Sequence, residues 1–292
     1  MTHTTRWLVT GAGGMLGRDL LDVLAGEPVT ALDRAALDIT DAEAVRAAVA
    51  GHDVVVNCAA WTDVDGAESA EESATAVNGT AVADLAVACA RSGARLLQVS
   101  TDYVLPGDAE HPYPEDAATG PLNAYGRSKL AGERAVAELL PDAGYIVRTA
   151  WLYGEHGRNF VATMLSLAAR QENVQVVDDQ YGQPTWSYEL ALRLAELGRS
   201  GQAPPGVYHA TAAGRASWYE LARAAYELSG LDPERVRPTD SSAFSRPARR
   251  PGFSVLGHAR WAEAGLPPLP EWRESLARAL DRPAFRALVA KH

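Results

Sequence analysis

A short apolar strand that runs directly into a glycine-rich turn constrains the fold of this chain more than any other stretch. Trp7–Thr10 has the length and apolar character of a buried strand, and Gly11, Gly14 and Gly17 follow it in a G-x-x-G-x-x-G pattern. Residues 18–25 then continue with helical periodicity. A strand, a glycine turn and a helix in this order are typical of a dinucleotide-binding unit, because glycines let the backbone approach a pyrophosphate at the helix N-terminus. A plain glycine-rich connection between strand and helix is the alternative.

The end of the next predicted strand bears on the choice of dinucleotide. Residues 29–32 form this strand, and Asp33 and Arg34 follow it. An acidic side chain at this position bonds the ribose 2′-hydroxyl of NAD, whereas an adjacent arginine accommodates the 2′-phosphate of NADP. Because both side chains are present, the sequence leaves NADH and NADPH open as the cofactor.

Strands and helices alternate through the first half of the chain. Further strands are predicted at residues 53–56, 96–99 and 145–149, and helices at residues 42–50, at 69–91 and from 125 onward. This alternation predicts an α/β fold with a doubly wound parallel sheet of the Rossmann type, in which ligands bind at the carboxyl ends of the strands. The candidate ligand-binding residues at or just beyond predicted strand ends are Gly11, Asp33, Ala59, Ala60, Thr101 and Trp151.

Thr101, Tyr125 and Lys129 form the candidate catalytic group. Thr101 follows the strand at residues 96–99, and Tyr125 and Lys129 lie four residues apart on one face of a predicted helix. A phenol with a pKa of about 10 exchanges protons poorly at neutral pH, and we expect a nearby ammonium to lower that pKa. Together the three side chains would donate a proton to a carbonyl that is being reduced. A solvated lysine packed over an aromatic ring is the simpler alternative.

The pattern becomes less regular after Trp151. Helices are predicted at residues 159–170, 188–197 and 217–228 and from 271 onward, with strands at residues 174–177 and 207–209. We therefore expect a dinucleotide-binding domain at residues 1–150. Residues 151–292 would form a smaller α/β domain that mainly binds substrate, with some segments returning to the sheet of the first domain. Three nearby arginines, Arg246, Arg249 and Arg250, could hold a phosphorylated ligand or lie in a solvated loop.

Composition and charge argue against several other classes of protein. Of the 292 residues, 47% are hydrophobic and 22% are charged, and the net charge of −10 disfavours a nucleic-acid or anionic-membrane surface. The chain has no run of about 18 consecutive apolar residues, and its N-terminus lacks the regions of a signal peptide, so no membrane span is expected. Cys58 and Cys89 lie in apolar stretches, and no two histidines have a metal-ligand spacing. We therefore expect a cytoplasmic protein with reduced cysteines and no catalytic metal.

Longer motifs resemble the extended short-chain dehydrogenase/reductase family and, within it, the reductases of dTDP-4-dehydrorhamnose. The glycine turn, residues 57–60 and the Tyr125-x-x-x-Lys129 pair are signatures of the wider family. The narrower likeness rests on residues 37–40, 61–68, 100–104, 125–133, 148–154, 159–160, 179–185 and 248–251. It spans nearly the whole chain, and its most specific motifs are S-T-D-Y-V at residues 100–104 and D-Q-Y-G-Q-P-T at residues 179–185.

The resemblance implies a reaction and a role for each matching residue. NADPH or NADH would deliver hydride to C4 of a dTDP-4-keto-6-deoxy sugar nucleotide, and Tyr125 would donate a proton to the C4 oxygen. Lys129 would lower the Tyr125 pKa and hold the nicotinamide ribose, while Thr101 would bond the reacting oxygen or tune Tyr125. The expected cofactor-binding residues are Gly11, Gly14, Met15, Leu16, Gly17, Asp33, Arg34, Asp38, Ile39, Ala59, Ala60, Trp61, Thr62, Val99, Tyr125 and Lys129. The expected substrate-binding residues are Val64, Thr101, Asp102, Tyr103 and Trp151.

Two positions depart from the family pattern. Some members form a metal-bridged dimer through glutamates, one of them just after the glycine turn, and this chain has the shorter Asp19 in that region. The sequence therefore leaves a monomer and a homodimer open. Leu105 also stands where an aromatic residue more commonly follows the valine.

Other functions on the same fold remain in competition. A sibling reductase could act on another dTDP-4-keto-6-deoxyhexose, because the difference lies in how the sugar is posed. A non-catalytic regulatory subunit is disfavoured by the presence of Thr101, Tyr125 and Lys129 together. The fold also supports epimerases and dehydratases. A dehydratase would need a second acid beside Thr101, but Asp102 is followed by Tyr103.

Overall fold

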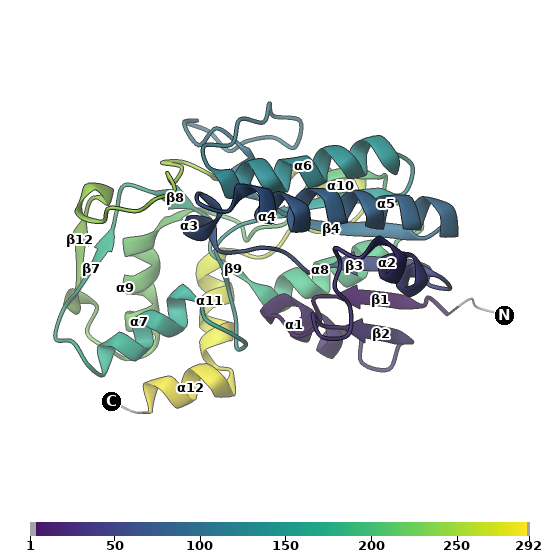
Figure 1. Cartoon of the computed structure of the whole chain (residues 1–292). Helices are drawn as coiled ribbons and strands as arrows, with labels where there is room; N and C mark the ends of the chain where they lie inside the picture. Colours follow the sequence, from purple (N-terminus) through teal and green to yellow (C-terminus); the bar gives the residue numbers. More distant parts are fainter. Residues whose placement is uncertain (1–3, 291–292) are drawn as a thin grey trace.

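A six-stranded parallel sheet organises the computed structural model, which describes residues 4–290 (Figure 1). The strands lie in the order β2-β1-β3-β4-β5-β10. Their bounds are β1 Trp7–Thr10, β2 Val29–Leu32, β3 Val54–Asn57, β4 Arg95–Thr101, β5 Gly144–Thr149 and β10 Gly206–His209. Residues 1–3 and 291–292 lie outside the described residues. What was expected of His3 and His292 falls wholly on them, and what was expected of the N-terminus as a signal peptide falls partly on them.

Helices cover both faces of the sheet, and the alternation of side chains along β1 shows why. Trp7 and Val9 pack into the apolar core under α1 and α8, whereas Leu8 packs into the core under α2, α5 and α6. All three side chains are fully buried, as expected of a strand covered on both faces. These helices are α1 Met15–Val23, α2 Ala42–Val49, α5 Ala81–Ser92, α6 Ala124–Leu139 and α8 Ser187–Arg199.

The strand order confirms the predicted doubly wound parallel fold. The chain passes from β1 to β2 on one side and then to β3 on the other, so the carboxyl ends of β1 and β3 form the switch point where such sheets bind ligands. The edge strand β10 comes from the second half of the chain and pairs in parallel with β5, with Val207 opposite Ile146. Helix α8, also from that half, packs against α1.

The helix predicted at residues 69–91 is one helical run with a π-helical turn in its middle. The turn, η1 Ala76–Thr80, separates α4 Glu71–Thr75 from α5. A Cβ on Gly79 would lie 3.0 Å from the Cβ of Ala131 on α6, so this glycine permits close helix packing. By length and composition alone the run Glu71–Ser92 could cross a membrane. Half of its most apolar 18-residue window is buried inside the protein, and core helices of soluble proteins pass the same test, so this evidence is weak.

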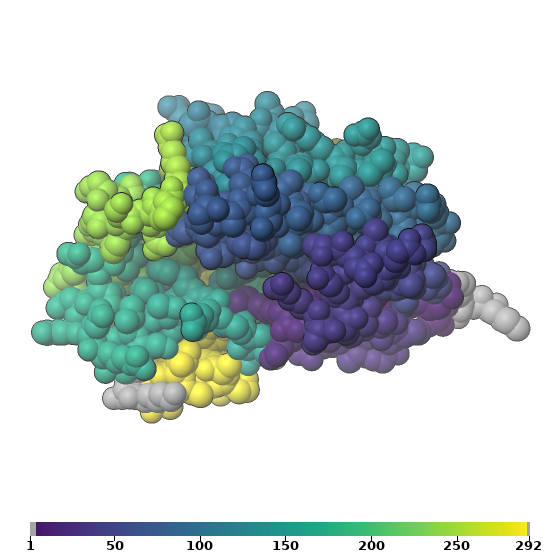
Figure 2. Space-filling model, in the orientation of Figure 1, coloured from purple at the N-terminus to yellow at the C-terminus, as the bar shows by residue number. Residues whose placement is uncertain are grey.

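A second lobe with its own apolar core stands at the other end of the molecule, drawn in green and yellow (Figures 1 and 2). Its helices and longer strands are α7 Phe160–Ala168, β7 Val174–Val177, α9 Trp218–Leu228, β12 Val236–Thr239, α11 Trp272–Leu280 and α12 Pro283–Val289. The expected C-terminal helix is thus two helices, because Pro283 lacks an N–H and begins a new one.

The remaining helices and strands are short. They are α3 Val64–Ala67, η2 Asp102–Val104, β6 Leu152–Tyr153, β8 Tyr181–Gly182, β9 Thr185–Trp186, β11 Ala216–Ser217, η3 Pro233–Arg235, η4 Ser241–Ala243 and α10 Ala259–Glu263. Two of them follow strands of the sheet, η2 directly after β4 and β6 shortly after β5.

Candidate active site

The glycine turn fits against the loop after β3, at the switch point of the sheet. Gly11 has a φ of 65°, and a Cβ on it would lie 2.5 Å from the backbone nitrogen of Ala59. A Cβ on Gly17 would lie 2.5 Å from the carbonyl oxygen of Gly11. Neither position can hold a side chain, so the turn and helix α1 approach the sheet closely enough to cradle a pyrophosphate.

Helix α1 begins at this cradle with its backbone donors uncapped. Gly14 is the N-cap residue and contributes no side-chain hydrogen bond to the first turn. The first N–H groups of a helix lack partners within the helix and favour anions. Met15 opens the helix and is partly exposed, whereas Leu16 is buried beneath it. The residues present therefore fit the phosphates of a dinucleotide.

The residues expected to contact the adenosine half of the cofactor lie beside this turn. Asp33 accepts hydrogen bonds from the backbone N–H groups of residues 35 and 36, and its side chain faces Gly13. Arg34 is exposed, and its charge contributes to lowering the pKa of the Asp38 carboxyl, after the hydrogen bonds from Thr40. Both candidate determinants of NADH or NADPH use are thus at the site, and the preference stays open.

Two buried asparagines hold the loop after β3, and sequence reasoning missed both as site residues. Asn57 accepts a hydrogen bond from Thr10 at 2.6 Å and another from the backbone N–H of Ala59 at 3.2 Å. Asn78, in the π-helical turn, accepts from the N–H of Trp61 at 2.9 Å and donates to its carbonyl at 3.0 Å. The signal available in the sequence was a polar residue within an apolar strand, for Asn57, and within an apolar helix, for Asn78. The two asparagines position the loop that carries the candidate cofactor residues 59–62.

Thr101 and Tyr125 meet at the carboxyl end of β4. Thr101 is buried, donates a hydrogen bond to Asp102 at 2.9 Å and accepts one from the N–H of Tyr103 at 3.2 Å. A hydrogen bond from Thr101 also acts on the phenol of Tyr125, near the start of α6. The helix is held there by its N-cap, Asn123, whose side chain accepts from the N–H of residue 126.

Lys129 is buried one turn further along α6. Its ammonium donates to the carbonyl oxygen of Val99 at 2.7 Å. Burial lowers the pKa of Lys129 to about 8, although the nearby Glu133 carboxylate opposes the shift. One of the three ammonium donors is therefore engaged by the expected cofactor residue Val99.

The expected effect of Lys129 on Tyr125 is wrong for this structure. Burial raises the pKa of Tyr125 above its ordinary value, the charge of Asp102 raises it further, and the Thr101 hydrogen bond lowers it only in part. Lys129 is not among the groups that shift this pKa. The ammonium is directed at Val99, and desolvation outweighs the attraction predicted from the spacing of four residues. Tyr125 is a protonated phenol at neutral pH.

Asp102 is the most perturbed carboxyl at this end of the sheet. Its side chain is 2% exposed, and burial raises its pKa to about 6 despite hydrogen bonds from Ser254 and Thr101. Ser254 comes from the segment between β12 and α10, and the sequence offered no signal for it. The pKa of the adjacent Tyr103 is also raised, first by burial and then by Asp102. The Tyr103 and Tyr125 rings meet edge to face, with centroids 6.0 Å apart.

Trp151 is held in a strained conformation directly after β5. Its φ of 47° is the one positive value among the described non-glycine residues. The indole stacks on Trp218 with ring centroids 3.6 Å apart, and a Cβ on Gly182 would lie 2.6 Å from it. Such strain is often stored at functional sites. Trp151 thus joins the sheet edge to α9 of the second lobe.

The arginine cluster at residues 246–250 forms part of a strap between the lobes. Arg250 makes a bidentate pair with Asp65 of α3, at 2.8 and 2.9 Å, and Arg246 approaches the same carboxylate at 3.6 Å. The carboxyl pKa of Asp65 is lowered, chiefly by the Arg250 hydrogen bond. Both arginines also act on the phenol of Tyr103, which places the strap beside the candidate site.

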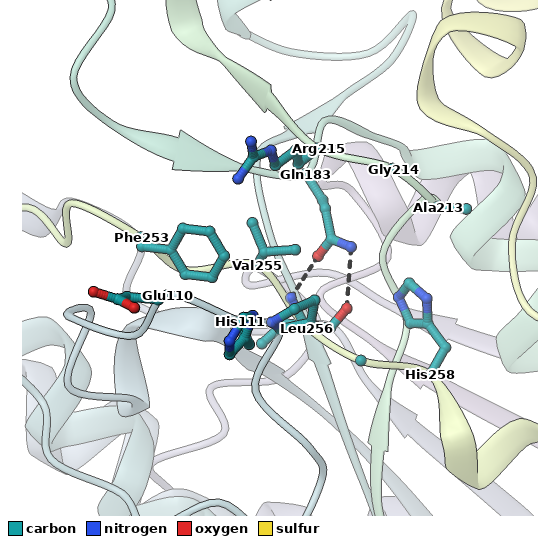
Figure 3. A pocket seen from close by; sticks show the side chains of 12 residues that line it. Glu110, His111, Gln183, Ala213, Gly214, Arg215, Phe253, Val255, Leu256 and His258 are labelled. Carbon is teal, nitrogen blue, oxygen red and sulfur yellow. Dashed lines mark hydrogen bonds between the residues drawn. The ribbon is translucent and has the colours of Figure 1, made fainter.

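A separate cavity of about 480 Å³ lies behind this segment (Figure 3). Phe253 and Val255 line it, whereas Ser254 between them faces Asp102. Figure 3 shows Gln183 in its wall, bonded through its amide to the backbone of Leu256. None of the predicted site residues lines this cavity, so it is distinct from the candidate site.

One cluster of possible metal ligands occurs among residues 4–290. Carboxylate oxygens of Asp19 and Asp22 and a ring nitrogen of His156 lie within 4.8 Å of one another. Asp19 is buried and accepts a hydrogen bond from Ser187, and its pKa is raised, mainly by burial. Clusters of acidic groups are common without an ion, so the absence of a catalytic metal and the choice between monomer and homodimer stay predictions.

The chain is similar to known proteins over nearly its whole length. The RmlD substrate binding domain family matches residues 5–285. A dTDP-4-dehydrorhamnose reductase of Streptomyces griseus is 58% identical over 97% of this chain and 95% of its own. A dTDP-4-keto-6-deoxy-D-glucose reductase of Streptomyces niveus is 52% identical over 94% of this chain and 96% of its own.

Solved structures agree with these relatives. The crystal structure of a dTDP-4-dehydrorhamnose reductase of Bacillus anthracis, in complex with NADP, is 35% identical and has a TM-score of 0.90, covering 95% of this chain and 99% of that chain. The family match and the identities above 30% both extend over far more than two thirds of the sequence. The resemblance read from the motifs is confirmed: this chain belongs to the RmlD family, the family of the dTDP-4-dehydrorhamnose reductases.

Proposed function

We propose that this protein is an NAD(P)H-dependent oxidoreductase that reduces the C4 ketone of dTDP-4-dehydro-L-rhamnose to give dTDP-L-rhamnose. The observation that carries the proposal is the meeting of Thr101 and a protonated Tyr125 at the carboxyl end of β4, with Lys129 one helical turn away. The relative from Streptomyces griseus and the NADP complex from Bacillus anthracis support the substrate and the cofactor.

Each side chain has a distinct task in this reaction. Bound NAD(P)H supplies the hydride that reduces C4. Tyr125 donates its proton to the C4 oxygen as negative charge develops there. Thr101 bonds the same oxygen or the phenolate that is left. Lys129, with one donor on Val99, has donors left to hold the nicotinamide ribose.

The remaining predicted residues are assigned to binding. The glycine cradle at Gly11 and Gly17 takes the pyrophosphate, and residues 59–62 and Val99 face the middle of the cofactor. The sugar lies against Asp102, Tyr103 and Trp151, with Val64 nearby. These roles follow from the position of each residue at the strand ends on which the two lobes converge.

The direct test measures oxidation of NADH or NADPH by its absorbance, with dTDP-4-dehydro-L-rhamnose generated in situ and the product identified by NMR. Tyr125→Phe removes the donor hydroxyl and should lower kcat by about 10²- to 10⁴-fold while cofactor affinity changes little. Tyr219→Phe is the matched control, because its hydroxyl only accepts a bond from Arg223 on α9. A kcat for Tyr125→Phe equal to that of the control would contradict the assignment.

The relative from Streptomyces niveus favours one second candidate, reduction of dTDP-4-keto-6-deoxy-D-glucose. The catalytic group would be the same, and the two ketosugars are stereoisomers that would place the C4 ketone differently against it. A comparison of kcat/KM for the two ketosugars separates the candidates. A higher value for the D-glucose derivative would make this chain a sibling reductase rather than a dTDP-L-rhamnose-forming enzyme.

A further inference from the structure

Trp151 has a backbone conformation that residues with a Cβ rarely adopt. Its φ of 47° lies in the left-handed region, and such strain persists only where the surrounding contacts hold it in place. One backbone contact is a hydrogen bond of 3.3 Å from the N–H of Thr185 to the Trp151 carbonyl. The indole itself is only partly buried, so part of it can meet a ligand. The contacts that hold the indole therefore decide the shape of the sugar site.

Trp218 covers one face of the Trp151 indole. The two rings are nearly parallel, with an interplanar angle of 9° and centroids 3.6 Å apart. Phe160 holds Trp218 from another side, with ring centroids 4.7 Å apart. Trp218 is also the first residue of α9, where Ser217 and Glu220 form a capping box. Both its ring and its backbone are thus fixed by the second lobe.

Gly182 approaches the same indole closely. A Cβ on Gly182 would lie 2.6–2.8 Å from Cε2, Cζ2 and Nε1 of Trp151, so an alanine there would push the indole away. Gly182 is not among the glycines with a positive φ, so the close approach and not the backbone conformation requires a glycine. Strands β8 and β11 place both supports, because Gly182 pairs with Ala216, two residues before Trp218.

We propose that Trp218 is a positioning residue for the reduction. Its indole, together with the backbone of Gly182, fixes Trp151 as a rigid wall of the sugar site, and this wall sets which ketosugar is reduced. The inference rests on the proposed function, which places the sugar against Trp151. Trp151 lies two residues beyond Thr149, and Thr149 pairs with Thr101 in the sheet. The wall therefore stands beside the catalytic group, whereas its support comes from the second lobe.

The two candidate ketosugars differ in a way that such a wall distinguishes. One is an L sugar and the other a D sugar, so they have opposite configurations at C5, the carbon that carries the apolar methyl group. An indole offers this methyl group a flat, apolar surface of fixed shape. A rigid wall accepts the methyl group in one pose while the C4 ketone faces Tyr125, whereas a movable indole would accept both sugars. The supports of Trp151 thus contribute to specificity without touching the substrate.

The decisive experiment compares kcat/KM for the two ketosugars in wild-type protein and in variants of the two supports. Trp218→Leu removes the stacked ring and should lower kcat/KM for the preferred ketosugar by about 10-fold or more, and much less for the other one. The KM for NAD(P)H should stay unchanged, because the glycine turn is not part of this contact. Trp218→Phe keeps an aromatic face and should recover most of the preference. Gly182→Ala should show the same loss of preference, since its Cβ displaces Trp151 directly.

Two matched controls separate positioning from stability. Trp272 also begins a helix, α11, and belongs to the same apolar core, but it stacks on no ring among the described residues. Trp272→Leu should therefore leave the preference unchanged even where the melting temperature falls. Gly252 lies beside β8, and a Cβ on it would be 3.8 Å from its nearest neighbour, the carbonyl oxygen of Gly107. Gly252→Ala should behave as the wild type.

Several results would overturn the inference. Equal falls of kcat/KM for both ketosugars in Trp218→Leu, or a wild type without any preference, would leave the stack as a structural contact only. An unchanged preference in Gly182→Ala would do the same, and this variant keeps Trp218 in place where Trp218→Leu does not fold. A wild type that reduces neither ketosugar gives a different result, because it refutes the proposed function and the inference with it.

Discussion

Replacement of Glu133 by glutamine tests the buried ion pair beneath the candidate site. Glu133 on α6 and Arg148 on β5 are 4% and 3% exposed, and their two hydrogen bonds measure 2.9 and 2.8 Å. Ser100, next to Thr101, donates to the same carboxylate at 2.6 Å. The pair thus ties the helix that carries Tyr125 to the centre of the sheet.

The expected loss of stability follows from what remains around Arg148. Glutamine removes the countercharge and one of the two acceptor oxygens, and the other neighbours of the guanidinium are only His209 at 3.3 Å and the carbonyl of Glu115 at 3.5 Å. The imidazole cannot replace the carboxylate, because burial and the Arg148 charge lower its pKa to about 3, so it is neutral. Breaking a buried pair in this way costs about 3–5 kcal/mol of the free energy of unfolding. The melting temperature should fall by roughly 6–15 °C.

A matched surface pair provides the control. Glu71 receives two hydrogen bonds of 2.7 Å from Arg127, but these side chains are 43% and 45% exposed. Glu71→Gln should therefore cost less than about 1 kcal/mol. Urea and thermal denaturation of both variants measure the difference. Equal losses in the two variants would refute the argument from burial, whereas a double variant, Glu133→Leu with Arg148→Met, should recover most of the loss.

Three further predictions concern the cofactor cradle and pH. Gly11→Ala should abolish cofactor binding by fluorescence titration, because its Cβ would clash at 2.5 Å, whereas Gly26→Ala, with nothing within 4 Å, should bind normally. Arg34→Ala should raise the KM for NADPH, and Asp33→Ala that for NADH, in steady-state assays; the opposite pattern would contradict their roles. Because the folded pKa of Asp102 is raised to about 6, its charge destabilises the fold increasingly between about pH 4 and 6. Asp102→Asn should therefore gain roughly 2–3 kcal/mol of unfolding free energy at pH 8 but little at pH 4; an equal gain at both would refute the assignment.

Local patterns were enough to predict the elements that carry the cofactor site. The strands at residues 7–10 and 29–32 match the structure, and the helix predicted at residues 42–50 is α2, which Asp41 caps through the N–H groups of residues 43 and 44. The short strands β6, β8, β9 and β11 escaped prediction. A strand of only two residues is too short to show a periodicity that can be recognised in the sequence. These strands also pair with partners distant in the chain, so the pairs form only when the chain folds.

The electrostatics of the site could not be predicted from spacing. The interval of four residues correctly placed Tyr125 and Lys129 on one helix, but it suggested that the ammonium lowers the phenol pKa. In the fold, the ammonium bonds Val99 on a strand, and burial raises the Tyr125 pKa instead. The desolvation of a group depends on everything packed around it, which a local interval does not contain.

The sequence by itself determined the parallel sheet, the glycine turn, the candidate catalytic group and the family, because each depends on residues close together in the chain or on motifs. Only the tertiary structure decided which distant residues complete the site. Ser254 reaches Asp102, and Arg250 reaches Asp65, across long stretches of chain. Such contacts result from the packing of two lobes, and packing depends on shape and burial rather than on any periodicity along the sequence.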